Sequence, residues 1–194
     1  MALVAVALAV YDRGMKRMVL LLLAPLAVVV GASFLLPNRV FYRDRRPTTA
    51  GRLVNAFWAR VYGLGLFPQW LARLEVAGRR SGVVRSIPVA VAHYEGERYL
   101  VSMLGERSEW VRNVRAAGGR ATLRHGIREP VQLVDVPVEL RAPIIKEYLR
   151  IAPGGRPHIP VDKDAPVADF EPIAGTYPVF SIEPAATGRQ LTSS

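Results

Sequence analysis

The stretch that decides the fold is RLEVAGRRSGVVRSIPVAVAHYEGERYLVSML, residues 73–104. It holds three apolar runs rich in valine, isoleucine and leucine, and glycine-containing turns separate them. This pattern is typical of β-strands, and the turn Glu95-Gly96-Glu97 predicts a hairpin between the last two runs. Pro88 interrupts the second run, which indicates an edge or a bulge because proline cannot donate to a strand ladder. The expected strands are 73–77, 84–94 and 98–104.

More strands and short helices follow along the chain. Trp110, Val111 and Val114 recur at helical spacing, and Ser108 is the expected N-cap of their helix. Several antiparallel strands with few helices fit a small barrel. We therefore expect an α+β fold that is mainly antiparallel β. Further strands are expected at 120–124, 130–136 and 177–182, and helices at 51–72, 108–117, 141–151 and 167–174.

The segment from Met18 to Asn38 contains no charged side chain and is long enough to cross a bilayer core as a helix. We interpret it as an uncleaved anchor in contact with membrane lipid, which would hold the protein at the cell membrane with its folded domain in the cytoplasm. Two alternatives stay open: a cleaved secretory signal ending near residues 30–32, which makes a secreted protein, and a buried helix of a cytoplasmic protein. The expected domains are 1–46 (anchor or signal, and linker), 47–184 (barrel) and 185–194 (flexible tail).

The chain of 194 residues is both basic and apolar. It has 26 Lys and Arg residues against 16 Asp and Glu, a net charge of +10, and 51% of its residues are hydrophobic. This composition excludes a disordered chain, which needs low hydrophobicity. The absence of cysteine excludes a disulfide scaffold, zinc–thiolate and iron–sulfur sites and cysteine catalysis. Residues 73–128 hold eleven arginines against five glutamates, so much of the positive charge is local.

Common catalytic and ligand-binding motifs are missing. The chain has no Walker motif, Ser81 sits one place late for a nucleophile elbow, and the three histidines lack the spacing of metal ligands. The basic region also lacks the interleaved aromatic residues and the reading helix of nucleic-acid-binding proteins. We therefore expect no metal and no nucleic-acid partner, and we assign no catalytic residue.

Two segments have the chemistry to bind an anion. The first is the turn Gly78-Arg79-Arg80-Ser81-Gly82, followed by Arg85 and Pro88. Its backbone amides, hydroxyl and forked guanidinium groups suit a phosphate or a carboxylate, although a tight basic hairpin on the surface is the alternative. The second runs from Ser102 to Glu106, where a strand gives way to a helix whose first amides favour an anion. Trp110 and Asn113 share one face of that helix and suit a flat ring, although Trp110 is alternatively a core residue.

Together these residues resemble the deazaflavin-dependent nitroreductase and quinone reductase family, which uses coenzyme F-420. The resemblance is strongest between Leu74 and Gly126, and it implies a split β-barrel of the FMN-binding type with flanking helices, preceded here by the N-terminal hydrophobic helix. In that family the basic turn grips the phosphate and glutamate tail of the coenzyme, and the loop before the tryptophan helix lies along the deazaflavin ring. The implied cofactor-binding residues are Arg79, Arg80, Ser81, Arg85, Pro88, Ser102, Met103, Leu104, Gly105, Glu106, Trp110 and Asn113.

The resemblance also implies an activity, which is hydride transfer from the reduced coenzyme to a quinone-like or other apolar acceptor, by a monomer or a homodimer. Leu104 and Glu106 stand where many members carry a basic residue or a second glycine. The chain has no clear match for the tyrosines of the family's acceptor pocket; Tyr148 and Tyr177 are weak candidates, and packing roles fit them better. The alternatives are an FMN-dependent oxidoreductase and a non-catalytic split barrel that binds the coenzyme or another anionic ligand.

Overall fold

The structure is a computed structural model and describes residues 28–33 and 35–185. The chain divides into two compact units, residues 1–40 and 41–194. In the first unit residues 28–33 and 35 are helical, and Asn38–Val40 forms the short 3-10 helix η1. Most of the expected anchor, Met18–Asn38, and most of the expected tail lie outside the described residues. Within the described ranges, no helix has the length and apolar character needed to span a membrane.

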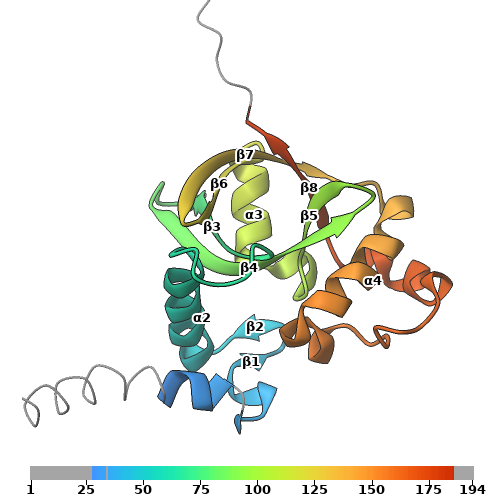
Figure 1. The fold of residues 1–194 in the computed structure, drawn as a ribbon, viewed down its shortest axis with the longest axis horizontal. Helices are drawn as coiled ribbons and strands as arrows, with labels where there is room; N and C mark the ends of the chain where they lie inside the picture. The colour runs from blue at the N-terminus through green and yellow to red at the C-terminus, as the bar shows by residue number, and fades with distance from the viewer. Residues whose placement is uncertain (1–27, 34, 186–194) are drawn as a thin grey trace, which may run out of the picture. The chain divides into compact units, whose positions relative to one another are not determined.

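The second unit is built on a closed antiparallel barrel of six strands, which confirms the expected α+β split-barrel fold (Figure 1). All three helices α2, α3 and α4 flank it, and short 3-10 helices connect the elements. The strands in their order around the barrel are β3 (Leu71–Ala77), β4 (Val84–Tyr94), β5 (Glu97–Val101), β8 (Val179–Pro184), β7 (Ile127–Asp135) and β6 (Arg120–His125). The helices are α2 (Thr49–Tyr62), α3 (Glu109–Ala116), α4 (Arg141–Ile151), η2 (Gly105–Arg107), η3 (Val138–Leu140), η4 (Pro153–His158) and η5 (Val167–Thr176).

Two hydrophobic cores share the barrel wall. Successive side chains of a strand point to opposite faces, so neighbouring residues serve different cores. On β8, Phe180 lies in the inner core with Val111 and Val114 of α3, whereas Val179 lies in the outer core beneath α4 and η5. β5 divides in the same way, with Leu100 inside and Val101 outside. The barrel is therefore apolar on both faces along these strands.

Pro88 lies where β4 changes partners, which confirms the edge position expected from the sequence. β4 pairs with β3 from Val84 to Ala90 and with β5 only from Val91 onward. Among the described residues, no strand pairs with the edge of residues 84–90 that faces away from β3. A proline is tolerated there because its missing N–H is not needed by a neighbour on that side.

The end of the expected linker, residues 42–46, takes part in an ordered hairpin that the sequence pattern did not suggest. β1 (Tyr42–Arg43) and β2 (Arg46–Pro47) pair as a two-stranded hairpin. Its turn residues Asp44 and Arg45 have φ of 51° and 57°, the values that a two-residue hairpin turn requires. The sequence carries no glycine at this turn, and for that reason its pattern did not suggest a hairpin.

Other boundaries differ as well, most of all that of the helix expected at 51–72, which is α2 and ends at Tyr62. The strand expected to run to Leu104 ends at Val101, so Ser102–Leu104 is a loop. Ser108 is the N-cap residue of α3, but its side chain makes no capping hydrogen bond. The helix expected at 167–174 is the 3-10 helix η5, which contains Pro172.

Gly119 joins α3 to the barrel and offers a test of the packing. Its φ is +82°, and a Cβ there would meet the Leu133 carbonyl oxygen at 2.4 Å. Gly96 has the same φ, but a Cβ there would meet nothing within 4 Å. We expect Gly96→Ala to lower the free energy of unfolding by about 1–2 kcal/mol, the cost of left-handed backbone. Gly119→Ala should lower it by about 3 kcal/mol or more, because overpacking is added. Urea unfolding of both variants measures the difference, and equal losses would contradict the close packing.

Candidate functional site

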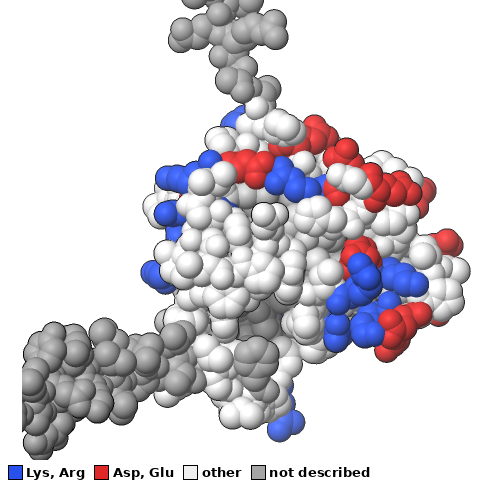
Figure 2. Space-filling view, viewed as in Figure 1, with Lys and Arg blue, Asp and Glu red and all other residues white. Residues whose placement is uncertain are grey.

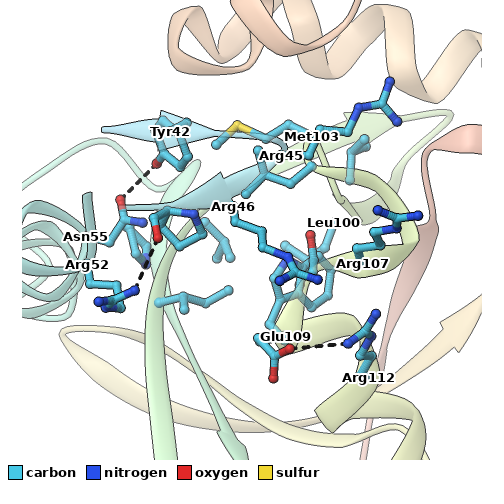
Figure 3. Close-up of a pocket in the computed structure, with 18 of the residues that line it drawn as sticks. Tyr42, Arg45, Arg46, Arg52, Asn55, Leu100, Met103, Arg107, Glu109 and Arg112 are labelled. Atoms are coloured by element: carbon cyan, nitrogen blue, oxygen red, sulfur yellow. Dashed lines mark hydrogen bonds and ion pairs between the residues drawn. The ribbon is translucent and has the colours of Figure 1, made fainter. Parts of the chain in front are cut away.

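A cavity of about 550 Å³ lies beside the barrel in the second unit. Its walls come from the β1–β2 hairpin, the first half of α2, the free edge of β4, the end of β5 and the segment leading into α3. This volume is within the range of small-molecule and cofactor sites. Figure 3 shows where the lining arginines come from: Arg45 and Arg46 from the hairpin, Arg52 from α2, and Arg107 and Arg112 from the η2–α3 segment.

The charges of the cavity are strongly unequal. One acidic side chain, Glu109, faces seven arginines, so the site favours an anion with several charged groups. Guanidinium groups bind phosphates and carboxylates through two parallel hydrogen bonds. Within the described residues, no carboxylate pairs with Arg46, Arg80 or Arg107. The seven arginines are Arg45, Arg46, Arg52, Arg79, Arg80, Arg107 and Arg112.

The cavity also has an apolar wall, so it suits a ligand with both a charged and a flat apolar part. Four consecutive residues of β4, Ile87–Ala90, line it along the unpaired edge of the strand. Trp110 lines it as well and packs on Phe180 of the inner core, with ring centroids 5.5 Å apart. The remaining apolar and aromatic lining residues are Leu100, Val101, Met103, Leu104, Tyr42, Pro47 and Tyr148.

Arg79 is held in place from α3. The Asn113 side-chain oxygen accepts hydrogen bonds from the Arg79 backbone N–H (3.2 Å) and from its guanidinium Nη1 (3.1 Å). The same Nη1 lies 2.6 Å from a carboxylate oxygen of Glu109. This hydrogen bond and charge lower the pKa of Glu109, which therefore stays ionised at neutral pH. Asn113 is buried and acts on the cavity through Arg79.

The basic turn does not offer the free backbone amides that its sequence suggested. The amide of Arg79 is bonded to Asn113, and the amides of Ser81 and Gly82 donate to the Gly78 carbonyl oxygen. The Ser81 hydroxyl oxygen accepts from the Val83 amide at 3.4 Å. The turn therefore contributes arginine side chains to the cavity and no amide cradle.

The loop before α3 is shaped by buried hydroxyl groups. The Ser102 hydroxyl donates to the Gly105 carbonyl oxygen at 3.0 Å, so its single hydrogen is used. The Ser108 hydroxyl must then donate to Ser102, with 2.7 Å between the two oxygens. Gly105 has a φ of +75°, and a Cβ there would meet the Thr176 carbonyl oxygen at 2.9 Å. These contacts present Met103 and Leu104 to the cavity.

The structure brings six of the twelve sequence-predicted site residues to the cavity wall. Ser102, Gly105 and Asn113 support the wall from behind. Glu106 points away and pairs with Arg115 at 2.5 Å, so it does not oppose an anion in the cavity. Ser81 and Arg85 do not line the cavity. The six at the wall are Arg79, Arg80, Pro88, Met103, Leu104 and Trp110.

Sequence reasoning missed the contribution of the hairpin and of α2. Arg45, Arg46 and Arg52 lie outside the two segments that the sequence singled out for anion binding. Their excess of positive charge was a signal, but nothing local showed that they converge on one space. Of the two tyrosines considered, Tyr148 lines the cavity, and burial raises its pKa. Tyr177 does not line it; its hydroxyl donates to the His158 carbonyl oxygen at 2.8 Å.

The comparisons with known proteins support the resemblance found in the sequence. The closed antiparallel barrel of six strands is the kind of architecture that this resemblance implies. Residues 52–138, a little under half of the chain, match the family described as F420H(2)-dependent quinone reductase, which confirms the resemblance found in the sequence. No curated protein matches the chain.

Among solved structures, one described as a domain-swapped dimer is 17% identical, with 69% of this chain and 92% of that chain covered and a TM-score of 0.44. An F420-H2 dependent reductase is 17% identical, with 59% and 95% covered and a TM-score of 0.42. A FAD-binding protein from Mesorhizobium loti is 13% identical, with 67% and 89% covered and a TM-score of 0.40. At these values the structures carry no statement about the function of this chain.

The position of Arg45 can be tested through His158. Arg45 lies over the ring of Tyr177, 5.8 Å from its centroid, and the pKa of His158 is lowered by burial and by the charge of Arg45. We expect Arg45→Gln to raise the pKa of His158 toward its usual value and Arg46→Gln to leave it unchanged, as measured by NMR titration. Because the folded-state pKa lies below the unfolded one, the stability linked to His158 is present above pH ~6.5 and falls as the pH drops through the folded pKa. If Arg45→Gln leaves the pKa of His158 unchanged, Arg45 does not lie close to His158.

Proposed function

We propose that the protein is a deazaflavin-dependent oxidoreductase that binds coenzyme F-420 in the arginine-lined cavity and passes a hydride to a quinone-like or other apolar acceptor. One observation carries this proposal: seven arginines and one glutamate surround a cavity that also has an extended apolar wall. The match of residues 52–138 to the F420H(2)-dependent quinone reductase family supports it.

The residues fit such a coenzyme. Arg79 and Arg80, with Arg46 from the hairpin, would hold the phosphate and carboxylate groups of the tail, because guanidinium groups bind these anions in a forked geometry. Trp110, Met103 and the edge of β4 would lie against the flat ring. Ser81 and Arg85, which the resemblance assigns to the coenzyme tail, do not line the cavity, so we propose no contact of theirs with the tail.

The reduced deazaflavin, when bound, supplies the hydride, so the protein needs no nucleophile or triad. Its own side chains bind, orient and exclude water. Asn113 and Glu109 keep Arg79 from sampling other rotamers, and the buried Ser102–Ser108 pair keeps the loop at 103–104 in one conformation. The apolar and aromatic residues of the cavity wall, among them Leu100 and Tyr148, suit an apolar acceptor such as a quinone.

We also propose that the protein is attached to the cell membrane and that its folded domain lies in the cytoplasm. An anchor at Met18–Asn38 would hold the site near lipid-soluble acceptors, with the catalytic domain of residues 47–184 in the cytoplasm. Fractionation of cells that produce the full chain tests this, and recovery of the protein in the soluble fraction alone would refute the anchor.

Binding of the coenzyme is the first test. Titration of the full chain with oxidised F-420 should change the coenzyme fluorescence saturably. Arg80→Ala and Arg46→Ala should each weaken binding by about 10-fold or more, the value of one charge-assisted hydrogen bond or pair. Arg85→Ala is the matched control from the same basic segment and should bind as the parent does. No saturable change, or equal losses in all three variants, would refute the cavity as the site.

Turnover separates an oxidoreductase from a coenzyme-binding protein. Mixing the chain with reduced F-420 and a soluble quinone analogue should restore the absorbance of the oxidised coenzyme at a rate proportional to protein concentration. Trp110→Ala should reduce this rate, because it removes part of the wall against the ring. Saturable binding without turnover would favour the non-catalytic alternative. Tighter binding of FMN than of F-420 would favour the flavin alternative, although one phosphate uses few of the seven arginines.

A further inference from the structure

A second surface lies at the far end of α2, away from the arginine-lined cavity. The loop after α2 and the turn between β6 and β7 meet there through their backbones: the Gly126 amide donates to the Gly63 carbonyl oxygen at 3.1 Å. A Cβ on Gly65 would lie only 2.7 Å from the Gly126 nitrogen, so the two segments are in direct contact. The side chains that project around this contact form what we call the loop patch: Leu64, Leu66, Phe67 and Ile127.

The loop patch is apolar and protrudes. Leu66 and Ile127 each expose 79% of their surface, and Leu64 exposes 61%. Side chains this exposed stand out from the surface and do not line a groove. The patch is therefore suited to insert into a fluid interface and not to receive a partner's side chain. Exposed apolar groups of this kind cost free energy in water and mark interaction sites.

A rigid base supports the patch. Phe67 packs back on α2, with its ring centroid 5.6 Å from that of Tyr62 and 6.1 Å from that of Trp58. Tyrosine and tryptophan are the residues that membrane proteins gather at the lipid–water interface. The aromatic side chains therefore hold the loop that carries Leu64 and Leu66. The loop does not have to become ordered when it contacts another surface.

The charges around the patch are positive. Arg60 lies in the last turn of α2 and is exposed. Arg124 and Arg128 flank the β6–β7 turn, and Arg73 lies at the start of β3. Two carboxylates lie close to these arginines, and both are paired. Glu75 is buried and contacts Arg73 (2.9 Å) and Arg128 (3.0 Å), and Glu129, next to Arg128, pairs with Arg98 (2.5 Å). In Figure 2 the surface over this end of α2 is uncharged, and basic side chains border it at the left edge of the molecule.

We propose that the loop patch docks the domain onto an anionic lipid bilayer, with Leu64, Leu66, Phe67 and Ile127 entering the headgroup boundary and the arginines contacting lipid phosphates. Protruding apolar side chains with a basic surround are the combination that binds peripheral proteins to such surfaces. This docking is independent of any anchor at Met18–Asn38 and of coenzyme binding. Asn55, which lines the cavity, and Tyr62, at the patch, lie about 10 Å apart along the axis of α2. A docked domain would thus hold its cavity close to the lipid.

The absence of cysteine allows a local test on the full chain. Leu66→Cys and Ile127→Cys, each labelled with a polarity-sensitive fluorophore, are mixed with vesicles of phosphatidylcholine alone or of equal parts phosphatidylcholine and phosphatidylglycerol. Val83→Cys is the matched control, since Val83 is also apolar and 57% exposed but lies in the turn at the opposite end of β3. We expect a blue shift at positions 66 and 127 with the anionic vesicles, a smaller one with neutral vesicles and none at position 83.

Charge reversal tests the role of the arginines. Arg60→Glu should reduce the shift at position 66, whereas Arg120→Glu, an exposed arginine at the other end of β6, should not. The proposal would be overturned if positions 66 and 127 showed no blue shift or if position 83 showed an equal one. It would also be overturned if the shift were the same with neutral and anionic vesicles. A blue shift that appears without vesicles and grows with protein concentration would also overturn it, in favour of a second copy of the chain. Coenzyme titration without lipid remains a separate measurement, so failure of one proposal leaves the other standing.

Discussion

The change of partner along β4 is the constraint on which the site depends. Up to Ala90 the strand is paired with β3, and from Val91 it is paired with β5. The first half of the strand therefore has one free edge, and free edges must be covered to prevent pairing with other chains. The start of α2 and the hairpin Tyr42–Pro47 lie at this edge and enclose the cavity with it. The cavity is the space between an unfinished sheet edge and its cover.

The strands were predictable because their signals are local. β4 and α4 begin and end where the hydrophobic pattern and the turn residues placed them, and α3 differs by one residue at each end. The hairpin at 42–47 was not predictable, because Asp44 and Arg45 adopt a backbone conformation that the sequence usually assigns to glycine or asparagine. Tertiary contacts such as the Arg45–Tyr177 stacking stabilise that turn, and such contacts leave no local trace.

The site was predictable in part for the same reason. Arg79, Arg80 and Trp110 lie within one stretch whose spacing marks the family, so sequence reasoning found them. Three of the seven arginines, Arg45, Arg46 and Arg52, precede the barrel strands and reach the cavity only because the hairpin and α2 cover the edge of β4. Arg85 shows the opposite error: closeness in sequence to the basic turn did not bring it to the cavity.

The two cores that share β5 and β8 have a consequence for how the chain reaches its fold. Because Leu100 and Phe180 face inward while Val101 and Val179 face outward, these strands present apolar side chains on both sides. Leu100 pairs with Phe180, so the barrel closes between segments far apart along the chain, and such non-local pairing is slow. Until closure, the apolar residues of both strands are exposed to other chains. The same alternation that gives the native barrel two cores therefore makes the nascent chain prone to self-association, and its yield will depend on concentration and temperature during folding.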